Sequence, residues 1–366
     1  MFLEYFHVRR GTLAFETRWL SKCPILSVST DTAPNSKKPF FGSVCVSILL
    51  FFIGGALGFM LKGVTFHETP PASFAGEVRE NSSEYTYVNP LLECDLGEAY
   101  LGNGGVRPSR QTLLKKIDEI KKDGDASFVS IYFRDLNNGP WLGINEREQF
   151  FPASLLKVPL MLAYYKRAET DPEIFNREVH IQGVLMRGEG QHFRPSETLD
   201  PSRPYAVKEL IERMVTQSDN DSALALFSAL PQNPLPQLYR DLKIEFPIND
   251  PESRITVRDY ATFFRVLFNA SYLRSDLSNQ ALETLAQSRF TQGLPALLPT
   301  EITVAHKFGE RRTDDVQQLH DCGIVYFPNH PYLLCVMTRG SDPDRQATAI
   351  AEISKVVFDD IHSQTN

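Results

Sequence analysis

The sequence predicts an α+β fold, in which an antiparallel sheet is flanked by helices and joined to an all-helical subdomain, with one transmembrane helix near the N-terminus. Two observations predict it. Strand-like segments occur near both ends of residues 109–366, with a long helical stretch between them and one helix after them. That order is typical of an antiparallel sheet with helices segregated around it. The second observation is a run of 22 uncharged residues, 40–61.

The composition narrows the class of protein. The chain has 366 residues, of which 42% are hydrophobic, and this is enough for a large buried core. Its formal net charge of −7 argues against a nucleic-acid partner, which needs a basic face. The five cysteines form no CxxC pair, and no Cys/His ligand spacing or Gly-rich phosphate loop occurs. We therefore expect neither a metal site nor a cofactor.

Residues 40–61 have the length of a transmembrane helix. At about 1.5 Å per residue the run spans roughly 30 Å, the thickness of the hydrocarbon core of a bilayer. A buried core helix of this length would normally show a polar face. A cleaved signal peptide would need residues 1–39 as its charged region, and no small-residue cleavage site follows closely. The sequence therefore favours a retained signal anchor that contacts membrane lipid.

Basic residues flank this anchor unequally. Lys22, Lys37 and Lys38 precede it, whereas Lys62 and the more distant Arg79 follow it. Cytoplasmic flanks carry the excess of Lys and Arg. We therefore expect residues 1–39 to be a cytoplasmic tail, and the C-terminal bulk to lie outside the cytoplasmic membrane, in the periplasm or at the cell surface.

Residues 62–108 read as a stalk, because they contain proline and glycine pairs and little sustained periodicity. The segment 85–94 within them is more apolar than a linker, which suggests that it docks on the domain that follows. Residues 109–366 then form the single outer domain.

The elements of the outer domain are predicted from periodicity, composition and turn signals. Residues 109–123 are an amphipathic helix that Ser109 caps and Gly124 ends. The other predicted helices are 154–168, 206–217, 221–229, 257–269, 278–287 and 344–361, and the predicted strands are 128–133, 141–144, 302–307, 322–327 and 332–338.

The first chemical motif is Ser154-Leu155-Leu156-Lys157, at the start of a predicted helix. At positions i and i+3 the two side chains share one helical face, so the amine can reach the hydroxyl. A lysine held out of water loses basicity and can then act as a general base. The positive end of the helix favours an oxyanion beside it. Alone the motif is weak, because this spacing is common by chance.

Two further motifs accompany the first. Ser218-Asp219-Asn220 lies between two predicted helices, and Lys307-Phe308-Gly309 stands at the end of a predicted strand. Taken singly, one is an interhelix turn with a helix cap and the other is a strand end that meets a turn. Taken together and in this order, the three motifs favour one catalytic site.

With these motifs the chain resembles the class A β-lactamase and penicillin-binding serine hydrolase family, whose signature is SxxK, SDN and KTG. The resemblance covers essentially all of residues 109–366, including the segments FPASLLKVPLM, AVKELIERMVTQSDNDSA and AHKFGE. It implies the β-lactamase/transpeptidase-like form of the α+β fold, and a serine hydrolase that acts through an acyl-serine intermediate.

The resemblance also implies a role for each motif residue. A serine attacks the substrate carbonyl, a lysine takes its proton, and a second serine relays a proton to the leaving nitrogen. The implied catalytic residues are Ser154, Lys157, Ser218 and, through its backbone N–H in the oxyanion hole with that of Ser154, Glu310. The implied substrate-binding residues are Asn220, which holds the amide side chain of the substrate, Lys307, which faces its carboxylate, and Gly309.

One departure from the family concerns the deacylating base. Class A β-lactamases carry a Glu-x-x-Leu-Asn motif after SDN, whose glutamate activates the hydrolytic water. This chain has no such motif, and the stretch is about a dozen residues shorter than the family needs. Glu245, Asp250 and Glu252 lie there, either as substitute bases or as solvated turn carboxylates. We expect acylation to proceed and hydrolysis of the acyl-enzyme to be slow.

The second departure is Phe308, where the family has threonine or serine. Its hydroxyl normally donates to the substrate carboxylate, so this chain loses that hydrogen bond. Arg311 or Arg312 either compensates by pairing with the carboxylate or is a solvated surface charge.

These inferences lead to an expected function with stated alternatives. We expect β-lactam hydrolysis at a reduced rate, with a β-lactam or D-alanyl peptide as the partner. The alternatives are a penicillin-binding D,D-carboxypeptidase or transpeptidase that acts on peptidoglycan peptides, and a non-catalytic binding module. Of the cysteines outside the anchor and the tail, Cys322 and Cys335 form either a disulfide or two buried thiols, and Cys94 is unassigned. His306 either lines the site or packs within its strand.

Overall fold

The computed structural model describes residues 78–79, 85–93 and 106–365, except 138, 231–232, 249 and 313–315. The predicted cytoplasmic tail 1–39, the predicted anchor 40–61, most of the predicted stalk and Cys94 lie outside the described residues. Among the residues that are described, no helix is both long enough and apolar enough to cross a membrane.

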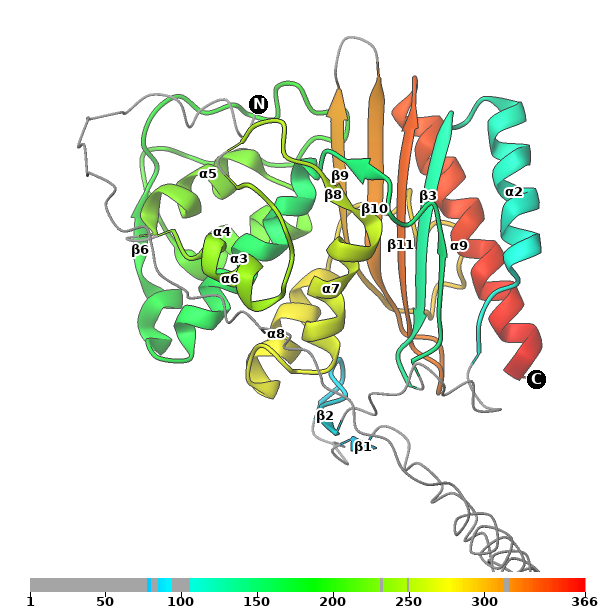
Figure 1. The fold of residues 1–366 in the computed structure, drawn as a ribbon. Helices are drawn as coiled ribbons and strands as arrows, with labels where there is room; N and C mark the ends of the chain where they lie inside the picture. Colours follow the sequence, from blue (N-terminus) through cyan, green and yellow to red (C-terminus); the bar gives the residue numbers. More distant parts are fainter. Residues whose placement is uncertain are drawn as a thin grey trace, which may run out of the picture. The chain divides into compact units, whose positions relative to one another are not determined.

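The centre of the domain is a five-stranded antiparallel sheet in the order β4-β3-β11-β10-β9 (Figure 1). Its strands are β3 (Phe128–Asp135), β4 (Trp141–Ile144), β9 (Val304–Arg312), β10 (Gln317–Val325) and β11 (Tyr332–Gly340). Because β9 is an edge strand, one side of it faces other elements rather than a further strand. The remaining short strands are β1 (Val78–Arg79), β2 (Leu91–Glu93), β5 (Gln149–Phe150), β6 (Glu178–His180), β7 (Pro204–Ala206) and β8 (Ile255–Thr256).

The helices form two groups on the two faces of the sheet. The first and last helices, α2 (Arg110–Asp123) and α9 (Pro343–Thr365), pack together on one face and enclose one apolar core (Figure 1). α7 (Val257–Phe268) packs on the other face, and the helical subdomain lies beyond β9. The other helices are η3 (Ala153–Leu156), α3 (Lys157–Ala168), η4 (Pro172–Asn176), α4 (Val207–Thr216), α5 (Asn220–Ala229), α6 (Leu235–Asp241) and α8 (Ser275–Ala286). The predicted α+β architecture is thus confirmed for the described residues.

The predicted helices are found, with changes at some ends. α2 begins after Ser109, whose hydroxyl accepts from the Thr112 N–H, and it ends at Gly124 with φ of 79°. α6 was not predicted, because its sequence is rich in proline. Pro234 stands at its N-cap and Pro236 in its first turn, where a missing N–H costs no helical hydrogen bond.

Two predicted boundaries near the motifs are wrong. The predicted helix 154–168 begins as the 3₁₀ turn η3, and the α-helix starts only at Lys157. The predicted strand 302–307 continues to Arg312, so that Lys307 lies in the middle of β9 rather than at its end. Pairing with β10 extends this strand through its charged end, which the apolar pattern of the sequence did not mark.

The segment around Val88 docks on the domain, as its apolar character predicted. Val88 is buried, and the N–H of Tyr87 donates to Asn279 Oδ1 at 2.9 Å. The N–H of Asn89 donates to the Phe268 carbonyl at 2.8 Å, and the Tyr326 hydroxyl donates to the Tyr87 carbonyl at 3.0 Å. These contacts tie this segment to α7, α8 and the β10–β11 hairpin.

The structure decides two alternatives that the sequence left open. Cys322 and Cys335 lie directly opposite each other on β10 and β11 and are joined by a disulfide. His306 is buried, and its Nδ1 lies 2.8 Å from Asp321 Oδ1 on the neighbouring strand. His306 therefore has the packing role within the sheet.

Candidate active site

Ser154 lies on η3, and the geometry of this turn has a local cause. Pro159 has no N–H to donate to the Leu155 carbonyl four residues before it. That carbonyl accepts instead from the hydroxyl of Tyr260 in α7, at 3.0 Å. Ala153, directly before the serine, has a left-handed φ of 49°. The result is a tight turn that leaves Ser154 partly exposed at the N-terminal end of α3.

β9 passes unusually close to this turn, and Gly309 makes the approach possible. A Cβ atom at position 309 would lie 2.9 Å from both the backbone nitrogen and the Cγ of Leu155, and 3.0 Å from the Pro152 carbonyl oxygen. Ordinary side chains do not tolerate such distances to backbone atoms. The absence of a side chain at Gly309 therefore allows β9 to pack closely against η3, and this packing brings Ser154 next to the edge strand.

Lys157 extends from the first residue of α3 to the turn between α4 and α5. Its Nζ donates to the Ser218 carbonyl at 2.6 Å, to Asn220 Oδ1 at 2.7 Å and to Ser218 Oγ at 3.1 Å. The side chain is 2% exposed, and this burial lowers the pKa of Lys157 to about 7. The nearby carboxylates of Asp219, Glu310 and Asp221 act in the opposite direction but do not cancel the effect of burial.

Ser218 is held in a strained backbone conformation on this turn, with φ of 55°. Asp219 fixes the turn, because its carboxylate caps α5, accepts from the Ser222 hydroxyl at 2.7 Å and pairs with Arg213. Gln191 adds a further brace, with Nε2 donating to the Ser218 carbonyl at 3.2 Å and Oε1 accepting from Asn220 Nδ2 at 3.0 Å.

Lys307 approaches the same hydroxyl from β9. Its Nζ donates to Ser218 Oγ at 2.9 Å and to the Phe308 carbonyl at 2.8 Å. The side chain is fully buried, and the pKa of Lys307 is held well below its usual value. Burial is the larger cause, and the neighbouring cation of Lys157 is the second. Two buried amines that share one hydroxyl cannot both remain charged at low cost.

Glu310 follows on β9 and holds a loop from the helical subdomain. Its carboxylate oxygens accept from the backbone N–H groups of His192 and Phe193, both at 3.1 Å. Burial raises the pKa of Glu310 despite these hydrogen bonds, which favour the charged form. The same loop carries Gln191, so Glu310 fixes the strand and the loop on one side of the site.

The structure thus brings together the residues named from the sequence. Lys157, Ser218, Asn220 and Lys307 form one hydrogen-bonded cluster, and Ser154 and Glu310 lie on the two elements that Gly309 packs together. Within the described residues, the Ser154 hydroxyl makes no hydrogen bond of its own. Sequence reasoning missed Gln191 and Tyr260, which belong to no motif and reach the site only through tertiary packing.

The three carboxylates considered as substitute bases are engaged elsewhere or exposed. Glu252 lies 3.7 Å from Arg254 and 3.9 Å from Arg311, and Asp250 accepts from the Glu252 N–H within its own turn. Glu245 is exposed. None of the three is among the charges that act on Lys157 or Lys307. The geometry therefore agrees with the solvated-turn interpretation of these residues.

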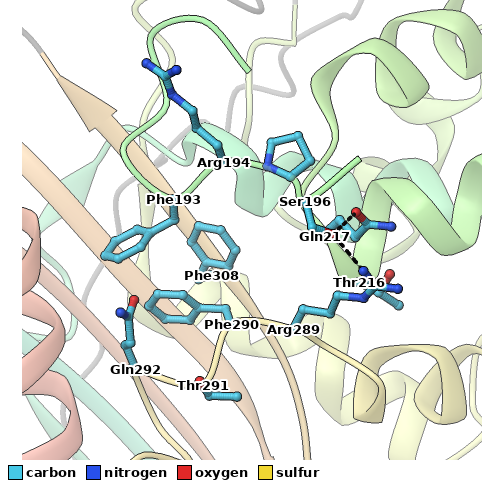
Figure 2. Close-up of a pocket in the computed structure, with 11 residues that line it drawn as sticks. Phe193, Arg194, Ser196, Thr216, Gln217, Arg289, Phe290, Thr291, Gln292 and Phe308 are labelled. Carbon is cyan, nitrogen blue, oxygen red and sulfur yellow. Dashed lines mark hydrogen bonds between the residues drawn. The ribbon is translucent and has the colours of Figure 1, made fainter. Parts of the chain in front are cut away.

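Phe308, Arg311 and Arg312 make contacts other than those expected of a site that binds a substrate carboxylate. Phe308 is 3% exposed and stacks on Phe290, with ring centroids 4.2 Å apart (Figure 2). The Arg311 guanidinium lies 3.9 Å from the ring centroid of Phe151 and near Glu252, and Arg312 is exposed. Arg311 is therefore held by its contacts with Phe151 and Glu252 and is not a freely solvated surface charge. Across the described residues, no group of three or more His, Cys, Asp or Glu side chains is arranged to hold a metal ion.

A family model described as the beta-lactamase enzyme family matches residues 112–361. No curated protein sequence matches the chain significantly.

Solved structures share the fold. A point mutant of PBP-A, solved as an acyl-enzyme complex with penicillin G, matches with a TM-score of 0.60 and 23% identity, over 71% of this chain and 99% of that chain. A class A β-lactamase from Mycobacterium abscessus matches with a TM-score of 0.58 and 20% identity, over 68% and 98%. The extended-spectrum β-lactamase TLA-3 matches with a TM-score of 0.60 and 20% identity, over 69% and 98%.

Proposed function

The chain belongs to the beta-lactamase enzyme family, and we propose that it is a membrane-anchored serine hydrolase whose Ser154 is acylated by a β-lactam or a D-alanyl amide. The observation that carries this proposal is the position of the Ser218 hydroxyl between two lysine amines, at 3.1 Å from Lys157 and 2.9 Å from Lys307. This arrangement supplies a base and a proton relay in one buried cluster.

Lys157 is the proposed base for the attack. With its pKa lowered to about 7, a large share of the amine is neutral at neutral pH. A neutral amine keeps two N–H donors, which suffice for the Ser218 carbonyl and Asn220 Oδ1, and its lone pair then accepts the proton of Ser154. The Ser154 oxygen forms a bond to the substrate carbonyl carbon at the same time. The proposed oxyanion hole is formed by the backbone N–H groups of Ser154 and Glu310.

Ser218 is the proposed relay to the leaving group. When the carbon–nitrogen bond breaks, the Ser218 hydroxyl gives its proton to the departing nitrogen and receives one from Lys157. Lys307 lies on the other side of this hydroxyl and faces the substrate carboxylate in the proposed complex. A bound anion would raise the pKa of Lys307, and this favours the charged form that attracts it.

Hydrolysis of the acyl-enzyme is proposed to be slow. Glu245, Asp250 and Glu252 make no contact with the cluster, so the segment after α5 offers no evident base for water. A missing general base costs roughly 10²–10⁴-fold in rate. This observation favours, as a second candidate, a penicillin-binding D,D-transpeptidase, which passes the acyl group from peptidoglycan peptide to an amine; a D,D-carboxypeptidase, which passes it to water, would need another base.

The proposed location is the outer side of the cytoplasmic membrane. Its support is the uncharged run 40–61 with its basic N-terminal flank, since these residues lie outside the described ones. A topology reporter fused after Asn366 should be active outside the cytoplasm. Activity in the cytoplasm alone would contradict the proposed orientation.

The test of the chemistry uses the full-length protein and a labelled penicillin. We expect a covalent label on wild type and on Ser202→Ala, a control on an exposed turn, and none on Ser154→Ala. A wild type that is neither labelled nor able to hydrolyse the penicillin, or a labelled Ser154→Ala, would show the mechanism to be wrong. A label that persists for hours would favour the penicillin-binding candidate, whereas rapid release would mean an efficient β-lactamase with another base.

A further inference from the structure

A pocket of about 370 Å³ adjoins the catalytic cluster on its β9 side (Figure 2). Four segments form its walls: the loop at 193–196, the end of α4 at 216–217, the residues 289–292 after α8, and Phe308 on β9. Known small-molecule sites have volumes of roughly 300–1,000 Å³, and a cavity of about 150 Å³ is enough for benzene. The pocket therefore has room for one aromatic ring and the groups attached to it.

Three phenylalanines give the pocket an aromatic wall. The rings of Phe290 and Phe308 are nearly parallel, with centroids 4.2 Å apart and 25° between planes. The Phe193 ring stands across both, 4.9 Å from Phe290 at 68° and 5.8 Å from Phe308 at 88°. Aromatic rings prefer such offset and edge-to-face contacts, so a further ring can join this cluster favourably.

The aromatic wall is connected directly to the catalytic groups. The Lys307 Nζ lies 4.1 Å from the Phe308 ring centroid and 2.9 Å from Ser218 Oγ. Thr216 and Gln217, which also line the pocket, directly precede Ser218 in the chain. A group that leaves through the Ser218 relay therefore departs at the mouth of this pocket.

The rim of the pocket is polar and includes the guanidinium of Arg289. Arg289 Nη1 donates to Ser196 Oγ at 2.7 Å, and that hydroxyl donates to Gln217 Oε1 at 3.1 Å. Within the described residues no carboxylate pairs with Arg289. Arg194 points away from the rings, as Figure 2 shows.

We propose that this pocket binds an aromatic side chain on the leaving-group portion of the substrate, so that Phe193, Phe290 and Phe308 select for an aryl-bearing leaving group. The inference rests on the proposed function, because it takes Ser218 as the relay to that leaving group. It also gives Phe308 a role: the residue that removes a hydroxyl donor stacks on Phe290 and meets edge-to-face the ring of Phe193, which is the most exposed ring of the wall.

The test compares two thioesters of N-acetyl-D-alanine, whose leaving groups are 2-mercaptopropionate and 2-mercapto-3-phenylpropionate. They differ only in a phenyl ring. On the full-length protein, we expect thiol release from the phenyl compound to have a kcat/KM about tenfold higher, the size expected for burial of part of a ring. Phe193→Ala should reduce this ratio to less than about twofold, since it removes the least buried ring of the wall.

Phe175→Ala is the matched control. Phe175 is also partly buried and also meets one ring edge-to-face, that of Tyr165 at 5.0 Å, but it does not line the pocket. This variant should keep the tenfold ratio. Equal kcat/KM values for the two thioesters in wild type, or an unchanged ratio in Phe193→Ala, would overturn the proposal.

A binding measurement separates this proposal from the proposed function. Ser154→Ala, which cannot be acylated, should bind N-acetyl-D-alanyl-D-phenylalanine about tenfold more tightly than N-acetyl-D-alanyl-D-alanine. If penicillin does not label Ser154 in wild type but this ratio holds, the chemistry is wrong and the pocket stands. If Ser154 is labelled but the two peptides bind equally or not at all, the chemistry stands and the pocket assignment is wrong.

Discussion

Lys157 and Lys307 donate to the same atom, Ser218 Oγ, at 3.1 and 2.9 Å, although they come from α3 and from β9 at opposite sides of the site. Both amines are buried, and among the described residues no carboxylate forms an ion pair with either of them. The balance of protonation in this pair, rather than either residue alone, therefore determines when the site can act.

The rate of acylation should increase with pH through about 7. Burial lowers the pKa of Lys157 to about 7, and only the neutral amine can take a proton. The neutral fraction, and with it the rate, rises as pH rises through that value and reaches a plateau about one pH unit above it. Labelling rates measured with penicillin from about pH 5.5 to about pH 8 would check this. A rate that is flat or that falls over this interval would exclude Lys157 as the base.

Tyr260→Phe should destabilise the turn that carries Ser154. Its hydroxyl donates to the Leu155 carbonyl, which lacks its α-helical donor because Pro159 has no N–H and has otherwise only the Lys157 N–H of the tight turn. We expect a loss of about 1–3 kcal/mol in the free energy of unfolding, measured by chemical denaturation. Replacing Pro159 by Ala in the same chain should recover part of the loss, because an N–H is restored. If the double variant lost as much free energy of unfolding as Tyr260→Phe and Pro159→Ala lose separately when added together, the restored N–H would have no effect, and this account would be wrong.

Gly309→Ala should impair both stability and acylation. A Cβ at this position would lie 2.9 Å from the Leu155 backbone nitrogen, so η3 and β9 must move apart. Overpacking of this kind costs about 1–3 kcal/mol. We expect a lower melting temperature and a labelling rate reduced by about tenfold or more, since a displaced nucleophile loses alignment. Unchanged labelling would mean that Ser154 does not depend on the approach of β9.

Removal of the carboxylates after α5 should leave the lifetime of the acyl-enzyme unchanged. Glu252 pairs with arginines, Asp250 holds its own turn, and Glu245 is exposed. The variants Glu245→Gln, Asp250→Asn and Glu252→Gln should each change the release of bound penicillin by less than about twofold, against the roughly 10²–10⁴-fold expected for a general base. A lifetime at least tenfold longer in any one of them would identify the missing base.

Much of the domain formed by residues 109–365 follows from local patterns. The cap at Ser109, the left-handed glycine at 124 and the hairpin that places Cys322 opposite Cys335 are all visible in the sequence, because turn and cap preferences act over a few residues. The motif spacing likewise marks Ser154, Lys157, Ser218 and Lys307. The extension of β9 beyond Lys307 is not visible, because the pairing that stabilises its charged end comes from β10.

The sequence by itself determined the chemistry available to this protein: a serine and a lysine on one turn, a second serine, and a lysine followed by phenylalanine in place of a hydroxyl. Only the tertiary structure decided how these groups work together. It placed two amines on one hydroxyl and gave the Leu155 carbonyl a partner in Tyr260. It also assembled Phe193, Phe290 and Phe308 from three separate segments into one wall. The physical reason is that motifs and caps depend only on neighbouring residues, whereas burial and packing depend on residues far apart in the chain. Burial sets the pKa values of the two lysines, and packing sets the shape of the pocket.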